Sequence, residues 1–158
     1  MSQTKNTLVQ IQNEDFDHNQ LYQWLRCSED KNSRFGAVIT FTGIVRDFNA
    51  RGAIHSIELE QYSPMTEIAL TQLVGRARQR FALGRVAVVH RVGKLTASEQ
   101  IVFVGVASEH RQKGFDAAEY IMDSLKAEIP LWKKEWFNEH ESEWVKAKEA
   151  DLNAAKRW

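Results

Sequence analysis

The sequence is poor in cysteine and proline and carries no excess of charge of either sign. Cys27 is the only cysteine among 158 residues, so an intrachain disulfide and a cysteine-based zinc site are both excluded. The 21 lysines and arginines balance 21 aspartates and glutamates, so the net charge gives no argument for nucleic-acid or membrane-surface binding. Any basic site must therefore be a local cluster of side chains.

Long hydrophobic runs are also missing. The longest strongly apolar run, IVFVGVA at 101–107, is far shorter than the roughly 20 residues that a membrane-spanning helix needs. The N-terminal stretch MSQTKNTLVQ lacks the apolar core of a signal peptide. Hydrophobic residues make up 43% and charged residues 27% of the chain, as is usual in soluble globular proteins. We therefore expect a cytoplasmic protein that binds neither a membrane nor nucleic acid.

The motifs of several enzyme classes are absent as well. The chain contains no GxGxxG, no GxxxxGK[ST] and no GxSxG pattern, which argues against common nucleotide sites and a nucleophile elbow. The five histidines lack the spacing of metal ligands and stand at 18, 55, 90, 110 and 140. We therefore expect no metal site and no cofactor, whereas a dispersed Ser/His/Asp triad stays open.

What is present indicates one α+β domain over residues 1–158 with largely antiparallel sheets. Residue patterns predict strands at 7–12, 36–47, 54–62, 85–93 and 99–108, and three helices at 17–27, 63–81 and 109–129. We expect 36–47 and 54–62 to pair as a hairpin, and a last hairpin to form from 131–137 and 143–148.

Side-chain types also predict helix starts and one buried face. Asp17 is expected to cap the first helix with Gln20 completing a capping box, while Ser63 and Ser108 are expected to cap the second and third. In the third helix a stripe with helical spacing predicts the buried face: Phe115, Ala118, Met122, Leu125 and Ile129.

A set of basic residues surrounds this third helix. His110 and Arg111 fall in its first turn, where unpaired backbone N–H groups and the helix dipole favour a phosphate or carboxylate. Lys126 and Lys133 border apolar surface, and partial burial lowers a lysine pKa in a way that suits acid–base or nucleophilic work. The competing interpretation is structural: all four side chains extend over the surface with their charges in water.

Several segments, in this order, resemble the large, catalytic subunit of molybdopterin synthase over most of the chain. They are FTGIVR (41–46), LEQYSPMTE (59–67), LGRVAVVHRVG (83–93), IVFVGVASEHR (101–111), IMDSLKAEIPLWKKE (121–135) and AAKRW (154–158). The resemblance implies a hammerhead-like domain and a sulfurtransferase of molybdenum cofactor biosynthesis. A small ubiquitin-like partner with a C-terminal thiocarboxylate would insert its Gly-Gly tail and deliver sulfur to cyclic pyranopterin monophosphate, forming the dithiolene of molybdopterin.

The resemblance also implies site residues. Lys126 in SLK would be the principal catalytic lysine, and Lys133 in WKK its companion. Substrate-binding positions would be Arg46, His110, Arg111, Phe41, Met122 and Lys148. Lys148 stands where the family often has arginine; lysine keeps the charge but loses the bidentate fork. On spacing alone, Arg46 is an exposed residue at a strand end, and Phe41 and Met122 belong to the core.

Helix geometry adds a separate inference. Lys126 lies 15 residues after Arg111, which at a rise of about 1.5 Å per residue is roughly 22 Å. One pterin phosphate cannot touch both. Either the helix is broken near Gly114, or His110 and Arg111 serve a pocket whose Lys126 comes from a second copy. The second option predicts a homodimer with composite sites, which would form the core of a heterotetramer.

Two other functions stay open at this stage. A noncatalytic module would bind a ubiquitin-like Gly-Gly tail without making product and without needing Lys126. A hydrolase or transferase for another phosphorylated metabolite would turn over without any thiocarboxylated partner.

Overall fold

The computed structural model describes residues 2–3, 5–27, 34–49, 52–146 and 148–158. Its larger sheet has the strand order β1, β2, β7, β9, β3, with bounds Ser2–Gln3, Thr7–Gln12, Val86–Arg91, Gln100–Ser108 and Ala37–Ile44. β2 and β7 run parallel, whereas every other neighbouring pair in this sheet is antiparallel. The larger sheet is therefore mixed.

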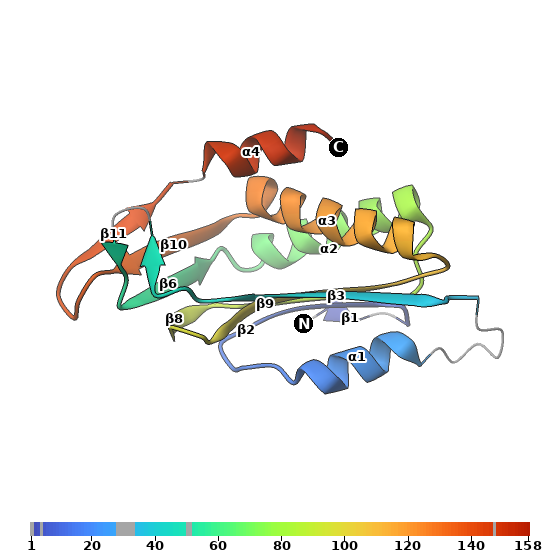
Figure 1. The fold of residues 1–158 in the computed structure, drawn as a ribbon, viewed down its shortest axis with the longest axis horizontal. Coiled ribbons are helices and arrows are strands. Elements are labelled where there is room, and N and C mark those ends of the chain that lie inside the picture. The colour runs from blue at the N-terminus through green and yellow to red at the C-terminus, as the bar shows by residue number, and fades with distance from the viewer. Residues whose placement is uncertain (1, 4, 28–33, 50–51, 147) are drawn as a thin grey trace.

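A second, fully antiparallel sheet lies at one end of the molecule (Figure 1). Its strand order is β11, β10, β6, β8, with bounds Ser142–Val145, Leu131–Trp136, Ser56–Gln61 and Gly93–Thr96. A short hairpin of β4 (Phe48–Asn49) and β5 (Gly52–Ala53) lies between β3 and β6 in the chain.

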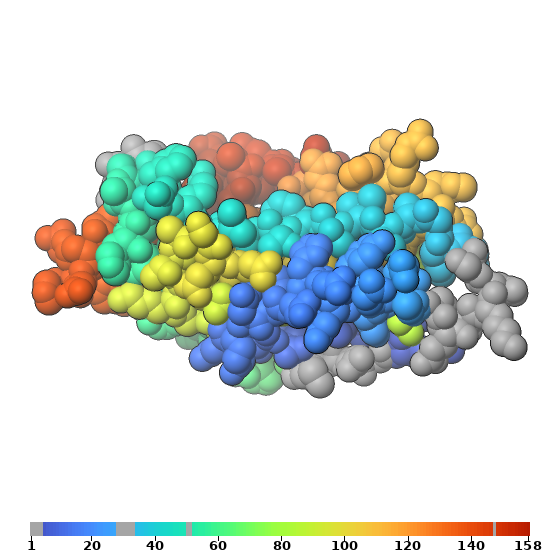
Figure 2. Space-filling model, turned by 60° about the horizontal axis from the view of Figure 1, so that its bottom comes forward, coloured from blue at the N-terminus to red at the C-terminus, as the bar shows by residue number. Residues whose placement is uncertain are grey.

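Helices cover both faces of the larger sheet. Helix α1 (His18–Arg26) lies on one face, and α2 (Met65–Phe81) and α3 (Arg111–Glu128) lie on the other (Figure 1). In Figure 2, turned so that the lower side of Figure 1 comes forward, the blue N-terminal segment that includes α1 lies at the front of the molecule. The last helix, α4 (Glu149–Lys156), packs on the outside of α3.

The alternation of side chains along the central strands explains these layers. In β9, Val102 and Val104 join the core under α2 and α3, whereas Phe103 joins the core under α1. In β7, Val88 and Val89 divide between the two cores in the same way. Strands buried on both faces read as continuous apolar runs, which is why their sequences predict strands strongly.

The α+β class and the largely antiparallel pairing are confirmed, but two details of the expected fold are wrong. The described residues contain four helices instead of three. The fourth, α4, was not predicted because it buries none of its side chains and shows no apolar stripe. β3 and β6 are not a hairpin: β3 pairs with β9, and β6 pairs with β8 and β10 in the other sheet. β2 and β7 form the one parallel pair among the described strands.

Two helix starts also differ from expectation. The Asp17 cap is confirmed, since its Oδ1 accepts from the Gln20 N–H at 3.1 Å. Ser63 does not cap α2, because the helix begins at Met65 after Pro64, without a side-chain cap. Ser108 does not cap α3, because its hydroxyl instead donates to the His110 carbonyl at 2.9 Å, and His110 occupies the cap position.

The buried face of α3 contains most of the expected stripe, since Ala118, Leu125 and Ile129 are buried and Met122 is partly buried. Phe115 is 58% exposed, while Gly114, Ala117 and Ile121 are buried. A Cβ at Gly114 would lie 2.7 Å from the Ile39 side chain, so small residues here let α3 approach β3 closely. None of the helices in the described part of the chain has the length and apolarity needed to cross a membrane.

Candidate active site

A pocket of about 340 Å³ lies where the second sheet meets the ends of β3 and α3. Four basic side chains expected at the site line it: Arg46, Lys126, Lys133 and Lys148. The other lining residues are Ile44, Val45, Phe48, Asn49, Ile54, Ile57, Ile101, Glu135, Phe137, Glu143 and Val145. The pocket thus combines an apolar floor with four cationic and two acidic side chains.

Local structure explains how two of these lysines meet. Lys126 occupies the last turn of α3, where a cation is favoured by the helix dipole. The chain then turns at Pro130, whose carbonyl accepts from the Thr66 hydroxyl of α2 at 2.9 Å, and enters β10 at Leu131. Lys133 follows within the first residues of that strand, so the turn brings both ammonium groups to one pocket.

The pleat of β10 separates two sets of side chains. Lys133 and Glu135 line the pocket. Lys134, between them in sequence, lies over the Trp136 and Trp144 rings, at 5.3 and 4.5 Å from their centroids. This alternation follows from the two-residue period of a strand. Lys133 therefore faces the pocket, whereas Lys134 faces the other side of the strand and stacks on aromatic rings.

Charge and burial act together on Lys133. Burial lowers the pKa of its ammonium group, and the positive charges of Lys126, Lys148 and Arg46 lower that pKa further, while Glu135 opposes them. A lysine with a lowered pKa is neutral at a lower pH than a solvated one. Lys133 is therefore suited to proton transfer.

Glu135 is the buried carboxylate of the site. It is 8% exposed and accepts a hydrogen bond from Asn49 Nδ2 at 3.1 Å. Among the described residues, the ammonium groups of Lys126, Lys133 and Lys148 make neither a hydrogen bond nor an ion pair, so their charges are available to an incoming anion.

His90 lies beneath this site in β7 and is fully buried in the strand interior. Burial lowers its pKa to about 4, and the nearby charge of Lys126 acts in the same direction. Its Nδ1 lies 2.8 Å from the Arg91 carbonyl, a geometry that places a proton on Nδ1 of the neutral ring. His90 therefore adds no positive charge to the site near neutral pH.

Sequence reasoning missed Glu135 and His90. Glu135 stands two residues after Lys133 in an alternating strand, which places both on one face and could have identified it. His90 offered no such signal, because it sits within a run of buried residues that reads as core. No group of three or more His, Cys, Asp or Glu side chains in the described ranges is arranged to hold a metal ion.

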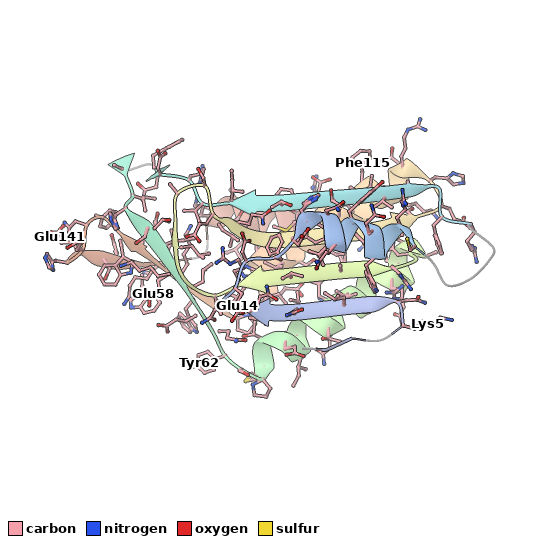
Figure 3. The ribbon with its side chains drawn as sticks, turned by 90° about the horizontal axis from the view of Figure 1, so that it is seen from below. Lys5, Glu14, Glu58, Tyr62, Phe115 and Glu141 are labelled. Carbon is pink, nitrogen blue, oxygen red and sulfur yellow. The ribbon has the colours of Figure 1, made fainter. Side chains whose placement is uncertain are left out.

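The remaining expected residues do not line this pocket within one chain. His110 caps α3 and Arg111 begins it, at the end opposite Lys126. In Figure 3, Phe115 near the start of α3 lies far from Glu141 in the β10–β11 loop. α3 is continuous from residue 111 to 128, which excludes the first of the two alternatives, a break near Gly114.

Phe41 and Met122 also lie outside the pocket lining. Phe41 is 43% exposed on β3, which forms an edge of the larger sheet in the described structure. Met122 is partly buried and packs against the core under α2 and α3. The exposed Phe41 and the start of α3 belong to surface, not to the cavity around Lys126.

Comparison with known proteins gives a consistent result. Residues 11–128 match the family model described as MoaE protein. The chain is 47% identical over 155 residues to the molybdopterin synthase catalytic subunit of Yersinia pestis, covering 98% of this chain and 99% of that one. The structure superposes on the molybdopterin biosynthesis MoaE protein from Burkholderia ambifaria with a TM-score of 0.80 at 39% identity, covering 96% and 97% of the two chains.

A more distant structure shares the fold. It is a protein–protein complex of subunits 1 and 2 of molybdopterin-converting factor from Helicobacter pylori, with a TM-score of 0.69 at 19% identity, covering 89% of this chain and 90% of that one. The match to the Yersinia pestis subunit runs along nearly the whole of both chains and includes the segments that carry the pocket lysines. The chain belongs to the molybdopterin synthase catalytic subunit family.

Proposed function

We propose that this catalytic subunit transfers sulfur from the C-terminal thiocarboxylate of a small ubiquitin-like subunit to cyclic pyranopterin monophosphate. The observation that carries the proposal is the pocket in which Lys126, Lys133, Arg46 and Lys148 converge from separate elements. Such a cluster costs free energy through mutual repulsion, which an anionic ligand relieves. A phosphorylated pterin and a thiocarboxylate both bring negative charge.

The source of sulfur lies outside this chain. Cys27, the only cysteine, is exposed at the end of α1, on the face of the larger sheet opposite α3. The pocket lining contains no thiol, so sulfur must arrive on another molecule. The Helicobacter pylori complex of two molybdopterin-converting factor subunits supports a protein as that molecule.

The basic residues divide into two roles. Arg46 and Lys148 hold the substrate phosphate, Arg46 through a guanidinium fork and Lys148 as a point charge. Lys126 and Lys133 face the reacting centre. The thiocarboxylate sulfur attacks a substrate carbon, a C–S bond forms, and the oxygen that leaves that carbon takes a proton from an ammonium group.

Release of the donor requires a second step. Water attacks the carbonyl carbon of the acylated sulfur, the C–S bond to the donor breaks, and the donor leaves as a carboxylate while the sulfur stays on the substrate. Lys133, with its lowered pKa, accepts the proton from water. Alternatively, the Lys126 amine attacks the carbonyl carbon of the acylated sulfur and forms an amide as the C–S bond to the donor breaks; water then hydrolyses this amide, which frees the amine and gives the donor carboxylate.

We further propose that each site is completed by a second copy of the chain. α3 is unbroken, so His110 and Arg111 stand roughly 22 Å from Lys126 along one helix. The exposed Phe115 lies in the first turns of α3 and the exposed Phe41 on the edge strand β3, and both provide apolar surface for contact between copies. A homodimer would bring His110 and Arg111 of one copy to the phosphate in the pocket of the other.

Reconstitution tests the proposal directly. Purified protein is mixed with a thiocarboxylated ubiquitin-like partner and the cyclic pterin, and dithiolene formation is measured. We expect Lys126→Ala to lower turnover by about 100-fold or more, because a general acid or base usually accelerates a reaction by at least that factor. Lys134→Ala, on the opposite face of β10, is the matched control and should keep turnover.

The other outcomes identify the competing functions. Tail binding without any product in the unmodified protein would indicate a noncatalytic module. Turnover of a phosphorylated metabolite without the thiocarboxylated partner would indicate a different transferase or hydrolase. Unchanged turnover in Lys126→Ala would remove the catalytic assignment of that lysine.

A further inference from the structure

Helix α4 carries a pocket residue but has almost no core of its own. Lys148, its N-cap residue, lines the pocket, and the Lys148 carbonyl accepts from the N–H groups of Asp151 and Leu152 at 3.0 and 3.2 Å. None of the helix side chains is buried, and Leu152 is 40% exposed. Eight residues are too few for a helix to persist alone in water, so contacts elsewhere must hold α4 in place.

The strongest of these contacts follow the helix. Trp158 packs edge-on against the rings of Tyr120 and Phe81, with centroids 5.7 and 6.1 Å apart, at the rim of the main core. Its indole N–H donates to Asp123 Oδ2 at 2.7 Å. The Arg80 guanidinium of α2 donates to the Trp158 main-chain oxygen at 2.6 Å and stacks over the same ring at 5.6 Å.

Arg157 adds charge to the same attachment. Its guanidinium donates to Asp123 Oδ2 at 3.0 Å and pairs with Glu119, both on α3. Asp123 thus accepts from two successive residues of the chain. We define the aromatic anchor as Trp158 and Arg157 together with the partners just described on α2 and α3.

We propose that the aromatic anchor is a positioning device for the active site: by fixing the far end of α4 to α2 and α3, it holds the ammonium group of Lys148 in the pocket. The proposal rests on the substrate-binding role given to Lys148 above. Trp158 is a positioning residue, separated from the pocket by the length of α4, roughly 12 Å. Loss of the anchor frees a helix that has no other buried side chain.

The first experiment measures Lys148 placement without any enzymatic activity. Competitive labelling with trace acetic anhydride over a pH series, read by mass spectrometry, reports the pH at which Lys133 becomes a neutral amine. The charged groups around Lys133 are Lys126, Lys148, Arg46, Glu135 and Glu143. Removing the Lys148 charge raises the pKa of Lys133, so the labelling midpoint moves to higher pH in Lys148→Gln.

The anchor variants then give the decisive comparison. We expect Trp158→Ala to move the Lys133 midpoint in the same direction as Lys148→Gln, and the double variant to move it no further than Lys148→Gln alone. Trp158→Phe keeps a ring in the cluster, so it should move the midpoint less than Trp158→Ala does. Arg34→Gln, which removes the ion pair with Glu109 just before α3 and touches no anchor residue, is the control and should leave the midpoint in place.

The second experiment reads the same effect in the reconstituted synthase. Trp158→Ala and Lys148→Gln should each raise KM for the cyclic pterin by about 1.5- to fivefold at unchanged kcat, the range for an exposed charge contact, without adding in the double variant. A midpoint that moves in neither variant, or only in Lys148→Gln, overturns the proposal. Midpoints that move as expected while KM stays constant leave the anchor in place and instead refute the substrate role of Lys148.

Discussion

The proposed composite site makes a quantitative prediction for mixed dimers. Lys126→Ala and Arg111→Ala chains, each inactive as pure homodimers, are unfolded or dissociated together and reassembled in equal amounts. Random pairing makes about half of the dimers mixed. In a mixed dimer one site carries both substitutions, whereas the other site takes an intact Lys126 from one chain and an intact Arg111 from its partner.

The expected recovery follows from this count. Each mixed dimer has one active site of two, and about half of the dimers are mixed, so the mixture should recover about one quarter of the unmodified activity. Sites contained within single chains would give none, because every chain then carries one defect. The separation behind this difference is roughly 22 Å along the continuous helix α3, far beyond the length of a pterin phosphate.

The assay is dithiolene formation with saturating thiocarboxylated partner, and two tags allow the mixed dimers to be purified and counted. Purified mixed dimers should reach about half of the unmodified activity per dimer. A control mixture of Lys126→Ala with Lys133→Ala must stay inactive, since both lysines line the pocket of the same chain. Confirmed mixed dimers of the first pair without activity would refute shared sites.

The remaining predictions concern packing and titration. Gly105→Ala should lower the free energy of unfolding by about 1–3 kcal/mol in urea titrations, because the added Cβ would overlap the Leu25 side chain. Gly75→Ala, on open helix surface, should instead raise that free energy by about 0.5–1 kcal/mol. Equal effects of the two substitutions would contradict this packing. Glu135→Gln should move the Lys133 labelling midpoint to lower pH, because the carboxylate raises the pKa of Lys133; an upward shift would exclude this contact. His90 should contribute about 3 kcal/mol to the loss of stability between pH 6.5 and 4, because its pKa is about 4 when folded and the unfolded chain alone binds the proton in that window. That part of the loss should be missing in His90→Gln when unfolding is followed at both pH values.

Local signals in the sequence predicted much of the fold. β7 and β9 are buried on both faces, so their sequences are continuous apolar runs that predict strands clearly. The Asp17 cap was predictable because capping depends on residues three apart. The α4 helix was missed for the opposite reason: it has no buried stripe, so its sequence carries no period that distinguishes it from an exposed loop.

Pairing between distant segments was beyond such signals. β3 and β6 are neighbours in the chain and both suit a strand, yet they belong to different sheets. β10 joins β6 through a ladder in which Lys133 lies opposite Leu59, and the sheet then extends to β11. Strand propensity does not specify which strand pairs with which, because the free N–H and C=O groups along any strand edge can form the same backbone hydrogen bonds.

The sequence by itself determined the family and the basic side chains available for chemistry, since both depend on residue identity and order. Only the tertiary structure decided which of those side chains share a pocket: it unites Arg46, Lys126, Lys133 and Lys148, and it leaves His110 and Arg111 at the far end of a rigid helix. The physical reason is that an unbroken helix keeps its two ends a fixed distance apart, whereas sheet pairing and the docking of α4 join positions whose separation in the chain gives no hint of their contact.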